Sequence, residues 1–263
     1  MADEELIKGR GAQMNPHNRF ERFSIVQEHI EGIDEKDDRL ESKTEYLEIF
    51  PKTIVNKVES PDLGMAYSMN PYQGCEHGCI YCYARDTHNY WGYNSGAEFE
   101  QKILVKKNAA ILLEDTFRQK NWQPYPIMLS GNTDCYQPAE RKFGITRQLL
   151  EVCLKYQHPV SIITKNALVE RDLDILEELN KMQLVNVSIT LTSLNEKLRL
   201  LLEPRTASAK RKLQTIETLS AKSIPVNVMM APIIPGLNSH EIFELARETS
   251  ARGASSFHYT IVR

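Results

Sequence analysis

The chain has 263 residues and a formal net charge of −3 at pH 7; 41% of its residues are hydrophobic and 25% are charged. These values are typical of a folded globular protein, and they exclude a disordered chain, a collagen-like repeat and a global positive field for nucleic acid. No apolar run approaches the ~18 residues of a membrane helix and the N-terminus does not resemble a signal peptide, so we expect a cytoplasmic protein without a membrane partner.

Residues 1–62 differ in composition from the rest of the chain. They contain Gly, Asn and Pro punctuation and a strongly charged stretch, and they show no sustained hydrophobic period. We expect an N-terminal extension, or arm, that packs on another part of the molecule. Residues 63–263 are regular and are expected to form one core domain.

In the core, short β-branched runs alternate with amphipathic helical runs. Strands are predicted at about residues 64–70, 125–130, 159–164, 185–192, 224–231 and 256–262, with helices between them. Such alternation favours parallel strands with right-handed crossovers, and the count predicts an α/β fold, a partial (β/α)6 TIM-like barrel. No covering helix follows the sixth strand, so we expect the barrel to be truncated at its C-terminus.

Three of the five cysteines, Cys75, Cys79 and Cys82, lie within eight residues, in a loop that follows the first predicted strand. Three thiolates so close together require a metal, and three ligands leave one position open for a small molecule. The alternatives are a zinc site with His77 or His88 as the fourth ligand and an iron–sulfur cluster that only transfers electrons.

The spacing Cys-x3-Cys-x2-Cys, with Tyr81 before the last cysteine, resembles the hallmark of the radical S-adenosylmethionine (SAM) superfamily. Further segments resemble its spore photoproduct lyase-like branch, often labelled DNA repair photolyase-like: NPYQGCEHGCIYCYAR, SGNTDCYQP, EPRT and APIIPGL. The resemblance implies a radical SAM core barrel with a [4Fe-4S] cluster on the three cysteines. It also implies reductive cleavage of SAM to methionine and a 5′-deoxyadenosyl radical, which abstracts hydrogen from a substrate. An electron donor of the flavodoxin or ferredoxin type is the implied partner.

Residues at the carboxyl ends of the later strands are candidates for SAM binding, because barrel sites form on that face. The resemblance places SAM beside Tyr81, near the amino-group contacts Ser130, Gly131 and Asp134, and within reach of Lys165. Hydroxyls on one face of the fourth strand and a small residue ending the fifth complete the set: Thr190, Thr192 and Ala231. Each also has an ordinary structural explanation, as a turn, strand or packing residue.

Cys135 is the candidate catalytic residue, because it follows the second strand and is expected to point toward the same mouth with an exposed thiol. By resemblance to the lyases it would return a hydrogen atom to the product radical. Its alternative is a small buried residue, and Cys153 is expected in the core.

Two groups of polar residues are candidates for substrate contacts: Asp134, Tyr136, Gln137, Glu140 and Arg141, and Glu203 with Arg205. Basic runs near the mouth and in the arm make a nucleic acid, including damaged DNA, a candidate substrate. The competing function is a non-catalytic zinc or iron–sulfur module that acts on nucleic acid or in a complex. The sequence leaves the oligomeric state open.

Overall fold

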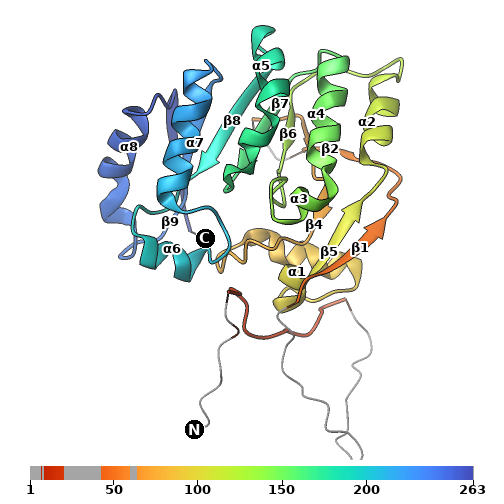
Figure 1. Ribbon diagram of the computed structural model, residues 1–263. Helices are drawn as coiled ribbons and strands as arrows, with labels where there is room; N and C mark the ends of the chain where they lie inside the picture. The colour runs from red at the N-terminus through yellow and green to blue at the C-terminus, as the bar shows by residue number, and fades with distance from the viewer. Residues whose placement is uncertain (1–6, 8, 21–42, 60–63, 263) are drawn as a thin grey trace, which may run out of the picture.

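The computed structural model describes residues 7, 9–20, 43–59 and 64–262 (Figure 1). Parts of the predicted arm, residues 1–6, 8, 21–42 and 60–62, lie outside the described residues, as do residues 63 and 263. None of the helices in the described part of the chain is long and apolar enough to cross a lipid bilayer.

The main sheet has seven strands in the order β10-β9-β8-β7-β6-β3-β2. Six of them are parallel neighbours in chain order, which confirms the predicted α/β fold and its six-strand count. Strand β2 (Val55–Lys57) pairs antiparallel with β3 and forms one edge. The six parallel strands are β3 (Tyr67–Met69), β6 (Ile127–Leu129), β7 (Val160–Thr164), β8 (Val185–Thr190), β9 (Val226–Ile233) and β10 (Ser256–Ile261).

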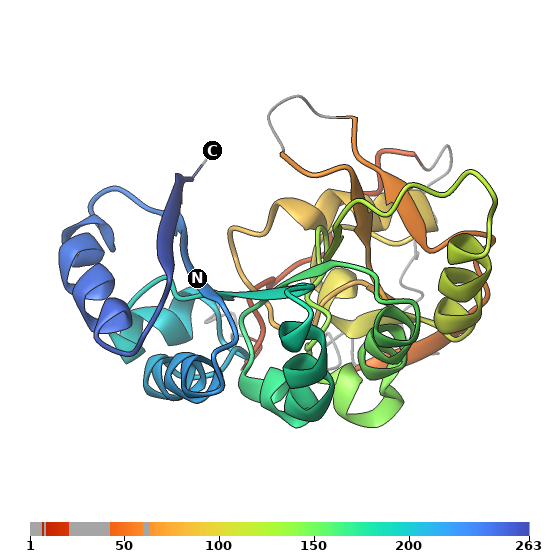
Figure 2. The same cartoon turned by 90° about the horizontal axis from the view of Figure 1, so that it is seen from above.

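The central parallel strands β7, β8 and β9 are rich in Val and Ile, and at least every second residue along each of them is buried, as a strand that packs in a core requires. In β8, five of the six residues are buried. Helices lie along one side of this sheet (Figure 2). They are α2 (Ala109–Phe117), α3 (Ala139–Phe143), α4 (Ile145–Lys155), α5 (Leu173–Lys181), α6 (Glu196–Leu202), α7 (Ala209–Ala221) and α8 (Ile242–Ser250), with 3-10 turns η2 (Ala167–Asp172) and η3 (Ser239–Glu241).

The helices pack through the faces that their periodicity predicts. In α5, Ile175, Leu176 and Leu179 are buried, as the spacing of the apolar residues requires. These side chains join one continuous core with the strands of the main sheet.

A second, three-stranded sheet was not predicted. Strand β5 (Lys102–Lys106) pairs in parallel with β1 (Glu45–Ile49) and antiparallel with the short strand β4 (Tyr72–Gln73). It is preceded by α1 (Ala97–Gln101) and by the 3-10 helix η1 (Tyr83–Trp91). The two arm strands, β1 and β2, therefore pair with strands of the core, while the boundary between residues 62 and 63 stays a prediction.

Candidate functional site

The three clustered cysteines lie on a tight loop between β4 and η1. Gly74 and Gly78 have positive φ values of 80° and 67°, a backbone conformation that glycine adopts without steric cost. A Cβ at Gly74 would come within 2.8 Å of the Lys102 carbonyl oxygen, and one at Gly78 within 2.9 Å of Glu100 Oε2. The backbone thus forms a close cradle that larger residues would fill.

Segments far away in the sequence hold this cysteine loop, residues 74–82, in place. Backbone hydrogen bonds join it to the middle of α1, to the last residue of α6 and to the turn that follows α6. They run from Cys75 N to Phe99 O (2.9 Å), from Ile80 N to Leu202 O (3.0 Å) and from Arg205 N to His77 O (3.2 Å). The loop is consequently fixed by tertiary contacts rather than by its own secondary structure.

All three thiols of the loop are free, and those of Cys75 and Cys79 are almost fully buried. Burial raises the pKa of each thiol, and the nearby Lys165 opposes this rise at Cys79 and Cys82. Lys165 would therefore stabilise the negative thiolates of Cys79 and Cys82 once a metal displaces their protons.

Within the described ranges, no set of three or more His, Cys, Asp or Glu side chains gathers closely enough to hold a single metal ion. A [4Fe-4S] cluster makes a different demand, because each thiolate binds a separate iron corner. Three free thiols around a glycine cradle, with no fourth cysteine on the loop, fit such a cluster better than a tetrahedral zinc ion.

A buried charge cluster lies directly beside Cys79. Glu203 Oε1 is 3.0 Å from Lys165 Nζ, and Glu203 Oε2 is 3.0 Å from Lys212 Nζ. The hydroxyl of Tyr81 also donates to Glu203, and Lys165 Nζ lies 5.4 Å from the centre of the Tyr81 ring. Burial would raise the pKa of Glu203, but the two ammonium groups outweigh it and hold that pKa well below its usual range.

Tyr81 and Lys165, two of the candidate SAM contacts, therefore lie against each other in the structure, and their role in SAM binding stays a prediction. Lys165 is bonded to Glu203, which the sequence analysis considered only as a substrate contact. Lys212, on α7, forms an ion pair with the same carboxylate. Lys165 could therefore turn toward a ligand carboxylate without leaving the buried Glu203 unpaired.

Asp134 is partly buried, and its carboxylate already accepts hydrogen bonds from protein groups. Its Oδ1 accepts from the hydroxyl of Thr164 (2.8 Å) and from the backbone N–H of Tyr136 (2.8 Å), while Oδ2 accepts from the backbone N–H of Lys165 (2.7 Å). His77 Nδ1 lies 3.3 Å from Oδ2. Asp134 thus connects the loop after β6 to the end of β7 and to the cysteine loop.

The remaining predicted SAM contacts lie in or shortly after strands β6, β8 and β9. Ser130 has a positive φ of 81°, and Gly131, whose carbonyl accepts from the Tyr83 hydroxyl (2.9 Å), follows it. Thr190 ends β8, and the buried Thr192 hydroxyl has no hydrogen-bond partner among the described residues. Ala231 lies in β9 and is partly exposed. These positions stay predictions.

The expected exposure of Cys135 is wrong. This residue is fully buried in the main hydrophobic core, its backbone N–H donates to Ser130 Oγ (2.6 Å), and its carbonyl accepts from Thr146 Oγ1 (2.6 Å). The turn at Ser130 directs it inward, and burial raises the pKa of its thiol well above the usual value. A thiol sealed in the core does not support a role as hydrogen donor. Cys153 is buried in the core as expected.

Three of the predicted substrate contacts after β6 are also buried. The Tyr136 hydroxyl donates to Asp172 (3.0 Å), Gln137 Nε2 donates to the Gly74 carbonyl (3.0 Å), and Glu140 accepts from Arg171 (2.6 Å). These polar side chains hold neighbouring loops together and do not reach a ligand.

The sequence analysis did not place the arm segment 9–13 on the cysteine loop. The buried Glu100 carboxylate accepts from the backbone N–H groups of Gly11 (3.1 Å) and Ala12 (2.8 Å), and from Arg85 (2.5 Å). A Cβ at Gly11 would overlap the carbonyl oxygen of Gly78.

Comparison with known proteins gives a consistent family. A profile described as the Radical SAM superfamily matches residues 69–249. An uncharacterised protein of Mycobacterium tuberculosis is 32% identical over 211 residues, which cover 79% of this chain and 62% of that protein. An uncharacterised protein of Methanocaldococcus jannaschii is 31% identical over 198 residues, covering 75% of this chain and 71% of the other.

Among solved structures, spore photoproduct lyases share the fold. A doubly substituted lyase with bound AdoMet and dinucleoside spore photoproduct aligns with a TM-score of 0.62 at 14% identity, over 82% of this chain and 61% of that one. Another, complexed with dinucleoside spore photoproduct, gives a TM-score of 0.61 at 15% identity, over 81% of this chain and 60% of the other. The chain thus spans about three-fifths of the mycobacterial relative and of these lyases.

Proposed function

Because this chain belongs to the radical SAM superfamily, we propose that it is an enzyme that cleaves SAM reductively at the cysteine loop and abstracts hydrogen from a substrate. The superfamily implies a [4Fe-4S] cluster and SAM as cofactors. When bound, they supply one-electron chemistry that generates a 5′-deoxyadenosyl radical. The single observation that carries the proposal is the set of three free thiols on one glycine-cradled loop beside the carboxyl ends of parallel strands.

The residues of the chain would hold and orient these groups. Cys75, Cys79 and Cys82 would bind three iron atoms and leave the fourth open to SAM. Tyr81 and Lys165 would lie beside the ligand, Lys165 supplying a positive charge for its carboxylate. The proposed SAM site is completed by Ser130, Gly131, Asp134, Thr190, Thr192 and Ala231.

Asp134 would act in this site without releasing its present contacts. Its carboxylate fixes the backbone of Lys165 and approaches His77, so it would align the end of β7 with the cysteine loop. An acceptor site for a ligand ammonium remains on the carboxylate, because a carboxylate has about four lone-pair sites and three of them accept hydrogen bonds from protein groups.

The substrate proposed here is a nucleic acid, with damaged DNA as one form. Its support is the fold that the chain shares with spore photoproduct lyases, structures of which contain a dinucleoside spore photoproduct. Reduction requires an electron from outside the chain, so the proposal includes a donor of the flavodoxin or ferredoxin type in the cytoplasm.

The test is 5′-deoxyadenosine formation from SAM by the full chain after anaerobic cluster reconstitution and reduction with dithionite. Cys82→Ala should abolish the product, and Cys153→Ala should retain it, because Cys153 lies in the core far along the chain from the loop. Iron and sulfide content and visible absorption are measured on each protein.

A brown protein that forms no 5′-deoxyadenosine would support a non-catalytic iron–sulfur module instead. A colourless protein with tightly bound zinc would contradict the cluster assignment itself. Activity that persists in Cys82→Ala would show that the ligand set is wrong.

A further inference from the structure

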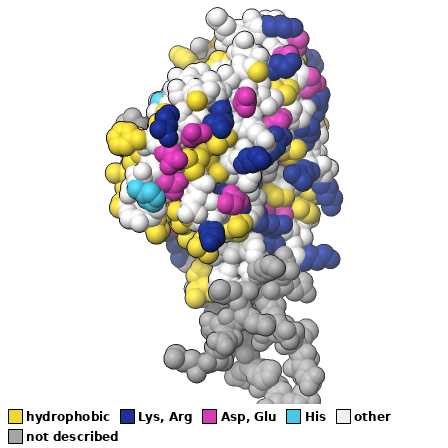
Figure 3. Space-filling view, turned by 60° about the vertical axis from the view of Figure 1, so that its left-hand side comes forward, with side chains coloured by type: hydrophobic (Ala, Val, Ile, Leu, Met, Phe, Trp, Pro, Cys, Tyr) yellow, Lys and Arg dark blue, Asp and Glu magenta, His cyan; other side chains and the backbone are white. Residues whose placement is uncertain are grey.

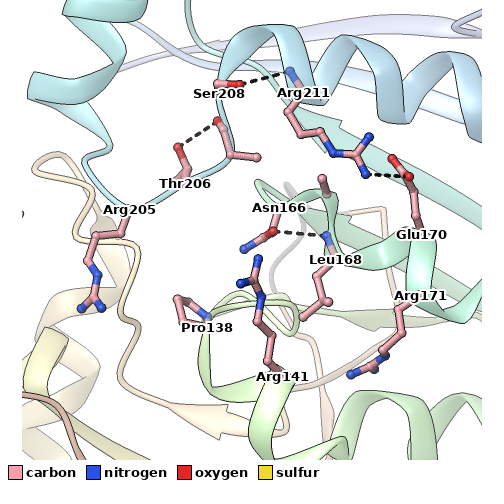
Figure 4. Close-up of a pocket in the computed structure, with 12 residues that line it drawn as sticks. Pro138, Arg141, Asn166, Leu168, Glu170, Arg171, Arg205, Thr206, Ser208 and Arg211 are labelled. Atoms are coloured by element: carbon pink, nitrogen blue, oxygen red, sulfur yellow. Dashed lines mark hydrogen bonds and ion pairs between the residues drawn. The ribbon is translucent and has the colours of Figure 1, made fainter.

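A pocket of about 680 Å³ opens beside the cysteine loop, on the side of the helices (Figure 4). Three connecting segments build it: the start of α3, the turn after β7, and the turn that leads into α7. It touches the cysteine loop through Asn166, whose Nδ2 lies 3.3 Å from His77 Nε2.

The lining contains four arginines and one carboxylate, although the chain as a whole has a net charge of −3. The single carboxylate, Glu170, is already paired with Arg211 at 2.8 Å and accepts from Thr215 at 2.6 Å. Basic side chains also gather along one margin of the face drawn in Figure 3. The wall of the pocket thus carries a local positive charge.

Arg171 and Arg211 have structural partners. Arg171 lies 2.6 Å from Glu140 and 2.7 Å from Asp172, two carboxylates buried behind the pocket wall. These pairs fix the shape of the wall and use much of the hydrogen-bonding capacity of the two guanidinium groups.

Arg141 and Arg205 remain available to a ligand. Among the described residues, the guanidinium of Arg141 has no acceptor, and Figure 4 shows it projecting from α3 toward Asn166. Arg205 has its nearest carboxylate, Glu76, at 3.7 Å, which is beyond hydrogen-bonding distance. Arg141, which has no partner among the described residues, and Arg205, which has one long ion pair with Glu76, therefore border one cavity with most of their N–H donors free.

We propose that this pocket binds a ligand with two or more phosphate groups. Guanidinium groups bind phosphate oxygens through two parallel N–H donors, and several of them around one cavity suit a polyanion better than a single carboxylate. The Ser208 hydroxyl, which caps α7 by accepting from Arg211 N (3.2 Å), keeps its own proton to donate. The volume lies within the range of ligand sites, roughly 300–1,000 Å³.

Phosphate binding here does not rest on the proposed radical chemistry, because no residue that lines the pocket is assigned to the cluster or to SAM. Arg141 and Arg205 are, however, candidate substrate contacts, so binding of a nucleic-acid backbone would extend the proposed function. The shared chemistry is the phosphate group, which a nucleic-acid backbone and a free phosphorylated molecule both offer. Bound phosphates would lie across Asn166 from His77, next to the cysteine loop.

The test uses the full chain and inorganic pyrophosphate as the probe, with calorimetric titration at low salt. Arg141→Gln and Arg205→Gln should each weaken binding by at least about tenfold, because each removes a charge-assisted donor pair. Arg118→Gln is the matched control. It removes the same charge from an exposed arginine directly after α2, outside the pocket, and should change binding by less than about twofold.

Thermal melting of each variant checks that it is folded. If Arg141→Gln is misfolded, the loss of pyrophosphate binding in Arg205→Gln alone tests the proposal. A short fluorescein-labelled oligothymidylate then distinguishes the two sources of phosphate. A nucleic-acid backbone is the ligand if the wild-type chain binds the oligonucleotide, if pyrophosphate displaces it, and if both pocket variants fail to bind it. Pyrophosphate binding without oligonucleotide binding indicates a free phosphorylated molecule.

The proposal fails if the wild-type chain shows no saturable pyrophosphate binding. It also fails if Arg118→Gln weakens binding as much as the pocket variants do, because the attraction would then be a property of the whole surface. Either failure leaves 5′-deoxyadenosine formation unaffected, so the two proposals are separable.

Discussion

The buried charge cluster beside Cys79 offers a sharp test of the electrostatic argument. Glu203 is fully buried, and each of its carboxylate oxygens lies 3.0 Å from a different lysine. Glu203→Gln keeps the shape of the side chain but removes its charge. The new amide has one acceptor oxygen, so its NH2 group must face either Lys165 or Lys212.

The expected cost follows from this geometry. Lys212 is 1% exposed and cannot regain water, so the substitution leaves a buried cation without a counter-charge. Breaking a buried pair by removing one partner costs about 3–5 kcal/mol in the free energy of unfolding. This is a large part of the ~5–15 kcal/mol that stabilises a typical domain.

Urea denaturation of the metal-free, reduced chain, followed by circular dichroism, measures this cost. Glu178→Gln is the control, because it makes the same change at an exposed carboxylate paired with Lys181, where less than about 1 kcal/mol is expected. The double variant Glu203→Gln/Lys212→Met should be more stable than Glu203→Gln alone by at least ~1 kcal/mol, since it removes one stranded charge. A loss below ~1 kcal/mol for Glu203→Gln, or no recovery in the double variant, would refute the reasoning.

Two further predictions concern the surroundings of the cysteine loop. Gly11→Val should displace segment 9–13 and speed alkylation of Cys75 by on the order of tenfold, measured by peptide mass spectrometry; Gly64→Val, where a Cβ meets no atom within 4 Å, should not. His88 is buried between Tyr93 and Phe99, and burial lowers its pKa from 6.5 to about 4. The unfolded chain takes up this proton first, so stability present above pH 6.5 should fall by up to about 3 kcal/mol as the pH drops toward 4. His88→Phe should flatten this fall in urea titrations; an unchanged pH dependence would show that the histidine does not cause it.

The six parallel strands could be predicted because each carries a local signal. Runs such as Val160–Thr164 are β-branched, lie between turn residues and alternate with amphipathic helices. The signal in the second sheet is harder to separate, since Glu45–Ile49 is short and lies next to a strongly charged stretch and Lys102–Lys106 follows a helix without a break. Tertiary pairing alone decides those elements.

The candidate site was predictable to the same limited extent. The cysteine spacing identifies the loop, but the contacts that hold it come from residues about 20 to 130 positions away in the chain. The sequence places Cys135 after the correct strand, yet its direction depends on the turn at Ser130. Likewise, the pairing of Glu203 with Lys212 depends on how α6 and α7 meet.

The contacts of the cysteine loop also determine when it can form during synthesis. Its backbone bonds to Phe99 and to Leu202, and it packs against Gly11 from the opposite end of the chain. A ribosome-bound chain that has only just exposed the three cysteines still lacks two of these three neighbours. Closing such long loops is slow and is achieved only when the distant contacts are available. We therefore expect a cluster to enter this loop only late in the biogenesis of the protein, and peptides confined to the cysteine motif would present the thiols without these tertiary contacts.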